Sequence, residues 1–202
     1  SEPDYRPEDW KDPLVEGSHN CYAYFLDDQI DKVKDKCKDL KLKSCSDLKP
    51  QPGHIGVDNK HPCSSKVKDK LGLYTCPSMI ERVMCDNMEN KKNVIKLTDF
   101  DVPCSEDYYK GVVVVDSGQH RKMKKGHTYH FYRQDSSGRW SHKPGTLPVE
   151  YVDASKKPIY VPHLADKIYN RKDPDNKDGI HYDKNCSYMC LPRNYKSETK
   201  AI

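Results

Sequence analysis

The chain has 202 residues and a formal net charge of +4, and 35% of its residues are hydrophobic while 33% are charged. This length supports one sizeable hydrophobic core, so we expect a single domain over residues 1–202, with two small domains as the alternative. The 35 basic and 31 acidic residues are interspersed, which argues against a nucleic-acid-binding protein, and no apolar stretch approaches the ~20 residues that span a bilayer.

The first half of the chain predicts helices and loops. Residues 1–17 are rich in Pro, Asp and Glu and predict an irregular N-terminal arm. A helix over 21–36 is indicated by four apolar residues at helical spacing after a capping segment, 18–20: Tyr22, Leu26, Ile30 and Val33. Residues 39–70 read as loop, and a second helix is expected at 77–87.

The second half of the chain changes to the periodicity of strands. We expect strands at 93–97, 111–116, 128–134 and 139–143, the last two joined by a hairpin turn at 135–138. A shorter edge strand is expected at 158–161, a helical turn at 164–169 and a polar C-terminal tail at 171–202. These elements together predict an α+β fold with long loops.

A basic run at 121–125 contains Lys122, Lys124 and Lys125. It follows a Gly-containing turn between two predicted strands, and we interpret it as a solvated loop. The alternative is a nucleic-acid contact, which predicts salt-sensitive binding that is lost when these three lysines are neutralised.

The nine cysteines are an odd number. Under oxidising conditions eight of them form four disulfides and one stays free, whereas a reducing compartment leaves free thiols or a zinc site. The candidate zinc ligands are clustered in one region: His54, His61, Cys63, Cys76 and Cys85. Because the chain has no Cys-x-x-Cys pair, disulfides are the favoured use of six cysteines, with open connectivity: Cys63, Cys76, Cys85, Cys104, Cys186 and Cys190.

Cys21 is the best candidate for a nucleophile. At the N-terminus of a helix the free N–H groups and the helix dipole favour the thiolate and lower the thiol pKa. The alternative reading is half of a disulfide or a small buried side chain.

The predicted hairpin offers a base for such a nucleophile. His127 and His130 point to opposite faces of their strand, and His142 on the returning strand lies beside His130. A second imidazole in that position would orient the first, as the third member of a catalytic triad. The alternative reading is a pair of hydrogen-bonded histidines on a two-stranded sheet.

Three short segments carry a resemblance to a known family: Asn20-Cys21-Tyr22-Ala23-Tyr24, Gln51-Pro52-Gly53-His54, and the hairpin 130–143 with His130 and His142. Their order resembles the papain-like NlpC/P60 superfamily of cysteine peptidases and amidases. The resemblance implies a helix packed on a small antiparallel sheet, with Cys21 as nucleophile, His130 as base and His142 as orienting residue. It also implies that residues 57–110 form a cysteine-bearing insertion. The hairpin is also similar to that of Cys- and His-bearing proteins of large DNA viruses, which implies a virion protein.

The leading hypothesis is therefore a thiol hydrolase of amide or isopeptide bonds that acts on a protein or peptide through an acyl-enzyme, without a cofactor. The alternative is a structural or virion-packaged protein that uses a disulfide-stabilised scaffold to bind a protein partner. A free, low-pKa Cys21 in a cleft beside His130 would favour the hydrolase, and a buried or paired Cys21 the scaffold.

Overall fold

The computed structural model describes residues 1–40, 42–58, 60–121, 126–169 and 179–196. Its α-helices are α1 (Pro13–Glu16), α2 (Cys21–Phe25), α3 (Asp31–Asp39), α4 (Ser64–Val67) and α5 (Cys76–Asp86). Short 3-10 helices lie at Pro7–Trp10, Leu42–Leu48, Ile55–Val57, Lys68–Lys70, Gln119–Arg121 and Pro162–Leu164. The strands are β1 (Met88–Glu89), β2 (Lys92–Asn93), β3 (Lys96–Thr98), β4 (Tyr108–Asp116), β5 (Thr128–Gln134), β6 (Trp140–Ser141), β7 (Ile168–Tyr169), β8 (Ile180–His181) and β9 (Lys184–Pro192). None of the helices in these ranges is long and apolar enough to cross a membrane.

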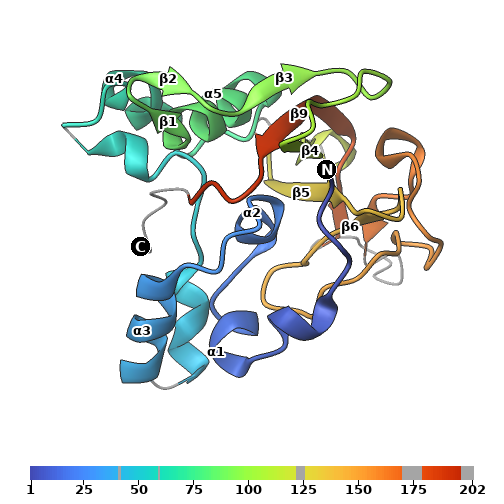
Figure 1. The fold of residues 1–202 in the computed structure, drawn as a ribbon, viewed down its shortest axis with the longest axis horizontal. Helices are drawn as coiled ribbons and strands as arrows, with labels where there is room; N and C mark the ends of the chain where they lie inside the picture. Colours follow the sequence, from blue (N-terminus) through green and yellow to red (C-terminus); the bar gives the residue numbers. More distant parts are fainter. Residues whose placement is uncertain (41, 59, 122–125, 170–178, 197–202) are drawn as a thin grey trace.

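The main sheet is antiparallel and has the strand order β3-β9-β4-β5-β6 (Figure 1). Its centre is β4, whose valine run, Val112 to Val115, is buried on both faces. β4 pairs with β5 on one side, with Val113 opposite Phe131, and with β9 on the other. Two small hairpins, β1-β2 and β7-β8, lie outside this sheet. The described chain is thus α+β, as the sequence predicted.

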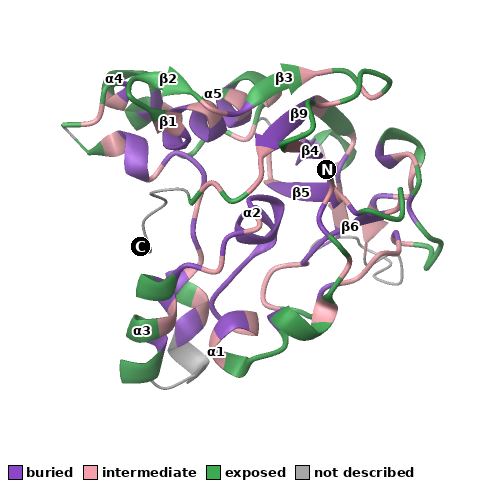
Figure 2. Cartoon of the chain, in the orientation of Figure 1, coloured by how far each residue is buried: buried purple, intermediate pink, exposed green. Residues whose placement is uncertain are grey.

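The sheet is covered on both faces. On one face, α2 and α5 pack Tyr22, Phe25, Met79 and Val83 against alternate sheet residues such as Phe131. On the other, the segments after β6 bury residues around Trp140, including Ile159 and Tyr182, against the remaining sheet residues. Figure 2 shows the resulting concentration of buried residues along α2, β5 and β9. The side chains of Cys21, the first residue of α2, and of His130 on β5 therefore reach one cavity from different layers.

Four disulfides cross-link the chain: Cys37–Cys45, Cys63–Cys85, Cys76–Cys186 and Cys104–Cys190. This confirms the expectation of four disulfides and one free thiol. The Cys76–Cys186 bond joins the start of α5 to β9 at the point where the β4–β9 register shifts, so Cys186 is the extra residue of a β-bulge.

The helix predicted at 21–36 is in fact two helices. α2 ends at Phe25, and Asp27 has a φ of +51°. The amides of Asp27 and Asp28 donate to the carbonyls of Tyr24 and Ala23, at 3.0 Å each, which is the Schellman pattern that ends a helix. The break was not predicted for two reasons. The apolar spacing continues across it, and the residue in the left-handed conformation is Asp27 rather than the usual Gly.

Two further expectations were wrong at the ends of the chain. Residues 184–192, placed in a polar tail, form β9, an inner strand between β3 and β4. The arm at 1–17 contains α1 and a 3-10 helix, with Trp10 and Val15 buried. Trp10 stacks edge-on against Tyr24 of α2, so the arm is part of the packed structure.

Other expected elements agree with the structure to different degrees. The helix at 77–87 and the strands at 111–116 and 128–134 are confirmed as α5, β4 and β5. The strand at 93–97 is split between β2 and β3, that at 139–143 is limited to β6, and 158–161 is limited to isolated bridges at Pro158 and Ile159. The helical turn at 164–169 is wrong, because Ile168 and Tyr169 form β7.

Candidate active site

Cys21 is placed by the cap of α2. The side chain of Asn20 accepts a hydrogen bond from the amide of Ala23 (3.2 Å), which starts the helix at Cys21. The Asn20 amide nitrogen also donates to the carbonyl of Pro50 (2.7 Å), so the segment 49–51 is attached at the residue before the thiol. The local cap thereby places the thiol, and a tertiary hydrogen bond of the same Asn20 side chain places one wall of the cavity beside it.

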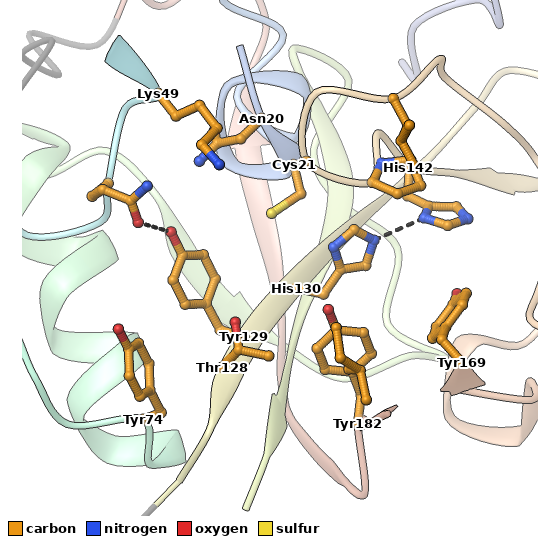
Figure 3. A pocket seen from close by; sticks show the side chains of 15 residues that line it. Asn20, Cys21, Lys49, Tyr74, Thr128, Tyr129, His130, His142, Tyr169 and Tyr182 are labelled. Carbon is orange, nitrogen blue, oxygen red and sulfur yellow. Dashed lines mark hydrogen bonds between the residues drawn. The ribbon is translucent and has the colours of Figure 1, made fainter. Parts of the chain in front are cut away.

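Cys21 is the free cysteine of this chain, and all eight others are in disulfides. Its side chain lines a cavity of about 440 Å³ together with those of His130 and His142, so the structure brings the three predicted site residues to one place. Figure 3 shows the sulfur of Cys21 beside the imidazole of His130, on the side of the ring away from His142.

The two histidines form a directed relay. His130 lies on β5 and His142 directly follows β6, and His130 Nε2 is 2.7 Å from His142 Nδ1. His142 Nε2 is 2.9 Å from the carbonyl oxygen of Val152. Because a carbonyl only accepts, His142 carries its proton on Nε2, and its Nδ1 accepts from His130 Nε2. His130 Nδ1 is therefore the unprotonated nitrogen, and it faces the side of the ring where Cys21 lies.

The pKa of Cys21 differs from the expectation. Burial raises it to about 12, and this outweighs the lowering by hydrogen bonds to the Phe131 and Tyr22 backbone and by the charges of Lys143 and Lys49. The low-pKa prediction was wrong, because α2 has only five residues and the thiol is 5% exposed, so desolvation outweighs the helix dipole.

The histidines are held neutral for the same reason. Burial, followed by the nearby His142, lowers the pKa of His130 well below its ordinary value, and burial lowers the pKa of His142 to about 4. At neutral pH the site thus contains a protonated thiol and two uncharged imidazoles rather than a thiolate–imidazolium ion pair.

Aromatic and amide side chains complete the cavity. Tyr182 stacks on the His130 ring at a centroid distance of 5.3 Å and holds its plane. Gln51 accepts a hydrogen bond from the hydroxyl of Tyr129, which leaves the amide nitrogen of Gln51 as a donor in the cavity wall. The sequence singled out Gln51 only as part of the segment 51–54 and did not single out Tyr182, which comes from the segment read as tail.

One buried cation next to the site was also missed. Lys143 donates to the carbonyl oxygens of Glu16 and His19 (2.7 Å each) and of Gly145 (3.0 Å), and burial lowers its pKa to about 8. The position of Lys143 directly after His142 was the available signal that it lies near the site. Its burial was not expected, because a lysine with no exposed surface is rare.

Several other candidate residues lie elsewhere. His127 precedes β5 and His54 precedes a 3-10 helix, and neither lines the cavity. Among the described residues, His61, Cys63 and Cys85 place their ligand atoms within 4.8 Å of one another. The two sulfurs, however, are joined as a disulfide, and Cys76 pairs with Cys186, so these cysteines serve as cross-links rather than as zinc thiolates. Lys122, Lys124 and Lys125 lie outside the described residues.

The comparisons with known proteins found a local similarity. The chain is 48% identical over 42 residues to "Insoluble matrix shell protein 1" of Ruditapes philippinarum, which is 21% of this chain and 28% of that protein. No protein-family model matches the chain. No solved structure matches it. The match spans little more than a quarter of the shell protein, so the site described above carries the functional argument.

Proposed function

We propose that this protein is a thiol hydrolase of amide or isopeptide bonds, with a papain-like arrangement of its site. The observation that carries the proposal is the relay in which Cys21 faces the unprotonated Nδ1 of His130 while His130 Nε2 donates to His142. A thiol, a base with a free lone pair and a third group that fixes the tautomer of the base are what nucleophilic catalysis of acyl transfer needs. The placement of the cysteine on a helix that packs against a strand bearing the histidine supports the papain-like reading.

The proposed reaction begins from the neutral pair. The Cys21 sulfur attacks the carbonyl carbon of the substrate as its proton moves to His130 Nδ1, and the carbonyl oxygen takes the negative charge. The tetrahedral species collapses when the amine leaves with the proton from Nδ1, which gives a thioester on Cys21. A water molecule then attacks the thioester, His130 accepts the water proton, and the proton returns to the sulfur as the acid is released.

Because the pKa of the Cys21 thiol is raised, the proposed attack on the carbonyl starts from the thiol and not from the thiolate of a preformed thiolate–imidazolium pair. Because the free thiolate is costly in the buried site, proton transfer accompanies attack instead of preceding it. His142 Nδ1 stabilises the imidazolium that forms, by accepting from the His130 N–H throughout. The amide nitrogen of Gln51 is a candidate donor to the developing oxyanion.

The first test is the alkylation of Cys21 in the native, unreduced protein. Eight cysteines are in disulfides, so intact-mass spectrometry after iodoacetamide treatment reports on Cys21 alone. We expect the rate to fall by about tenfold or more in His130→Ala, because general-base assistance is lost. His127→Ala is the matched control, since this histidine lies outside the cavity. Equal rates in the wild type and His130→Ala would contradict the hydrolase.

A second candidate is a non-catalytic scaffold that binds a protein partner. Three observations favour it: the thiol is almost fully buried, its pKa is raised to about 12 rather than lowered, and the local match is to a shell matrix protein. A screen with fluorogenic peptide amides separates the two, because the hydrolase predicts turnover that Cys21→Ser abolishes. If peptides bind without turnover and Cys21→Ser binds them equally well, the scaffold is the better account. Packaging in a virion stays a prediction.

A further inference from the structure

The cavity beside Cys21 has an unusual charge balance. Fifteen described residues line it, and they include no Asp or Glu. The two histidines are neutral at physiological pH, so the single permanent charge in the lining is that of Lys49. A cavity that is otherwise built from tyrosines, amides and aliphatic side chains thus presents one positive group.

Lys49 is carried on a fixed segment rather than a free loop. Its neighbours Leu48 and Pro50 are buried, and the carbonyl of Pro50 accepts the hydrogen bond from the Asn20 amide. Two residues further on, Gln51 is held by the Tyr129 hydroxyl. Figure 3 shows the Lys49 side chain extending beside Asn20, on the same side of the cavity as Cys21.

A comparison with Lys143 shows that the charge of Lys49 is available. Lys143 has no exposed surface, and three carbonyl oxygens accept hydrogen bonds from its ammonium group. Lys49 is only partly buried, and no hydrogen bond or ion pair joins its ammonium to another residue in the part of the chain that the structure describes. The field of Lys49 nevertheless reaches both Cys21 and Lys143. Two cations therefore act on the space around the thiol. The Glu16 carboxylate, which does not line the cavity, offsets part of the charge of Lys143, and no carboxylate in the described cavity wall offsets that of Lys49.

We infer that the substrate is an acidic peptide, one of whose carboxylates pairs with Lys49 while the scissile carbonyl lies against Cys21. This inference rests on the proposed hydrolase and specifies its substrate class. A carboxylate in this position gains a charge-assisted hydrogen bond in a partly enclosed site and offsets the positive potential of the two lysines. A cationic group there would meet repulsion from both. The tyrosine-lined remainder of the cavity accommodates uncharged parts of the peptide.

The inference is tested with two alkylating agents that differ only in charge, iodoacetate and iodoacetamide. The quantity measured is the ratio of their rates at Cys21, so any change in thiol reactivity cancels. We expect Lys49→Met to lower the iodoacetate-to-iodoacetamide ratio by about threefold or more, and Lys49→Glu to lower it further. Lys92→Met, an exposed lysine of β2, is the control and should leave the ratio unchanged. An unchanged ratio in both Lys49 variants would overturn the inference.

A binding measurement tests the acidic-peptide inference even if Cys21 does not react with the alkylating agents. NMR titration of the Cys21→Ser protein compares N-acetylglutamate amide with N-acetylglutamine amide, which differ by one carboxylate. Tighter binding of the glutamate compound that is lost in Lys49→Met supports the acidic-peptide site, whereas equal binding of the two refutes it. Failure of the hydrolase itself appears separately, as an iodoacetamide rate that His130→Ala does not change.

Discussion

The hydrogen bond between His130 and His142 determines which nitrogen of His130 acts as the base. His142→Leu removes the acceptor while it keeps a side chain of similar bulk in the buried position. The His130 Nε2–H group then has no partner, so the tautomer with the proton on Nδ1 becomes competitive. In that tautomer the nitrogen that faces Cys21 donates a proton and cannot accept one.

The size of the effect follows from the hydrogen bond that is lost. A hydrogen bond between neutral groups contributes about 0.5–1.5 kcal/mol, and a buried donor without a partner costs up to about 3 kcal/mol. Since about 1.4 kcal/mol is a factor of ten, the ratio of the productive to the unproductive tautomer of His130 falls by between about twofold and about 150-fold. We expect the Cys21 alkylation rate, and any hydrolytic activity, to fall by up to that upper factor, because both follow the fraction of His130 in the productive tautomer.

The assay combines kinetics with a direct observation of the tautomer. Alkylation rates are measured for wild type, His142→Leu and His142→Asn, and ¹⁵N chemical shifts of His130 report which nitrogen is protonated. His142→Asn offers a carbonyl acceptor and should restore part of the rate, whereas Glu150→Gln, 3.4 Å from His142 Nε2, should change little because Val152 still accepts. If His142→Leu alkylates at the wild-type rate with the tautomer unchanged, the relay has no functional role.

Three further predictions concern stability. Gly111→Ala places a Cβ 2.4 Å from a ring carbon of Phe25, so we expect a loss of about 1–3 kcal/mol of unfolding free energy in urea denaturation; an unchanged midpoint would show that α2 moves freely on the sheet. Replacing both cysteines of the Cys76–Cys186 disulfide by Ser opens a loop with a sequence separation of 110, and the expected loss is about 3–5 kcal/mol, read as a lower Tm under oxidising conditions. Burial raises the pKa of Asp86 to about 7 from an ordinary 3.8, so the stability that its bound proton provides is present at low pH and lost as the pH rises through about 7. Asp86→Asn should flatten that loss in denaturation curves between about pH 4 and about pH 7, and a wild-type curve that is already flat there would contradict it.

The local sequence was sufficient for some elements because their signals are short-range. The valine run of β4, the alternating strand β5 with its turn at 135–138, and α5 all depend on neighbouring residues, and all were predicted. The odd cysteine count similarly indicated one free thiol. Cys21, His130 and His142 were selected from a helix start and a hairpin, and the structure places them around one cavity.

The pairing of segments that are distant in the chain was decided only by the tertiary structure. β9 reads as a polar tail because its side chains alternate little, yet it is stabilised by hydrogen bonds to β3 and β4 and by two disulfides, which no local pattern encodes. The same holds for the site, because Lys49 and Tyr182 of the cavity wall and the nearby buried Lys143 come from three parts of the chain.

The protonation of the site is the clearest case of tertiary control. The sequence places Cys21 at a helix N-terminus, where the helix dipole lowers a thiol pKa. The packing of the sheet and helices removes water from the thiol, however, and this raises its pKa instead. The residue types that can carry out the chemistry are therefore a property of the sequence. Their charge states depend on burial, which is a sum over contacts from the whole fold and has no local signature.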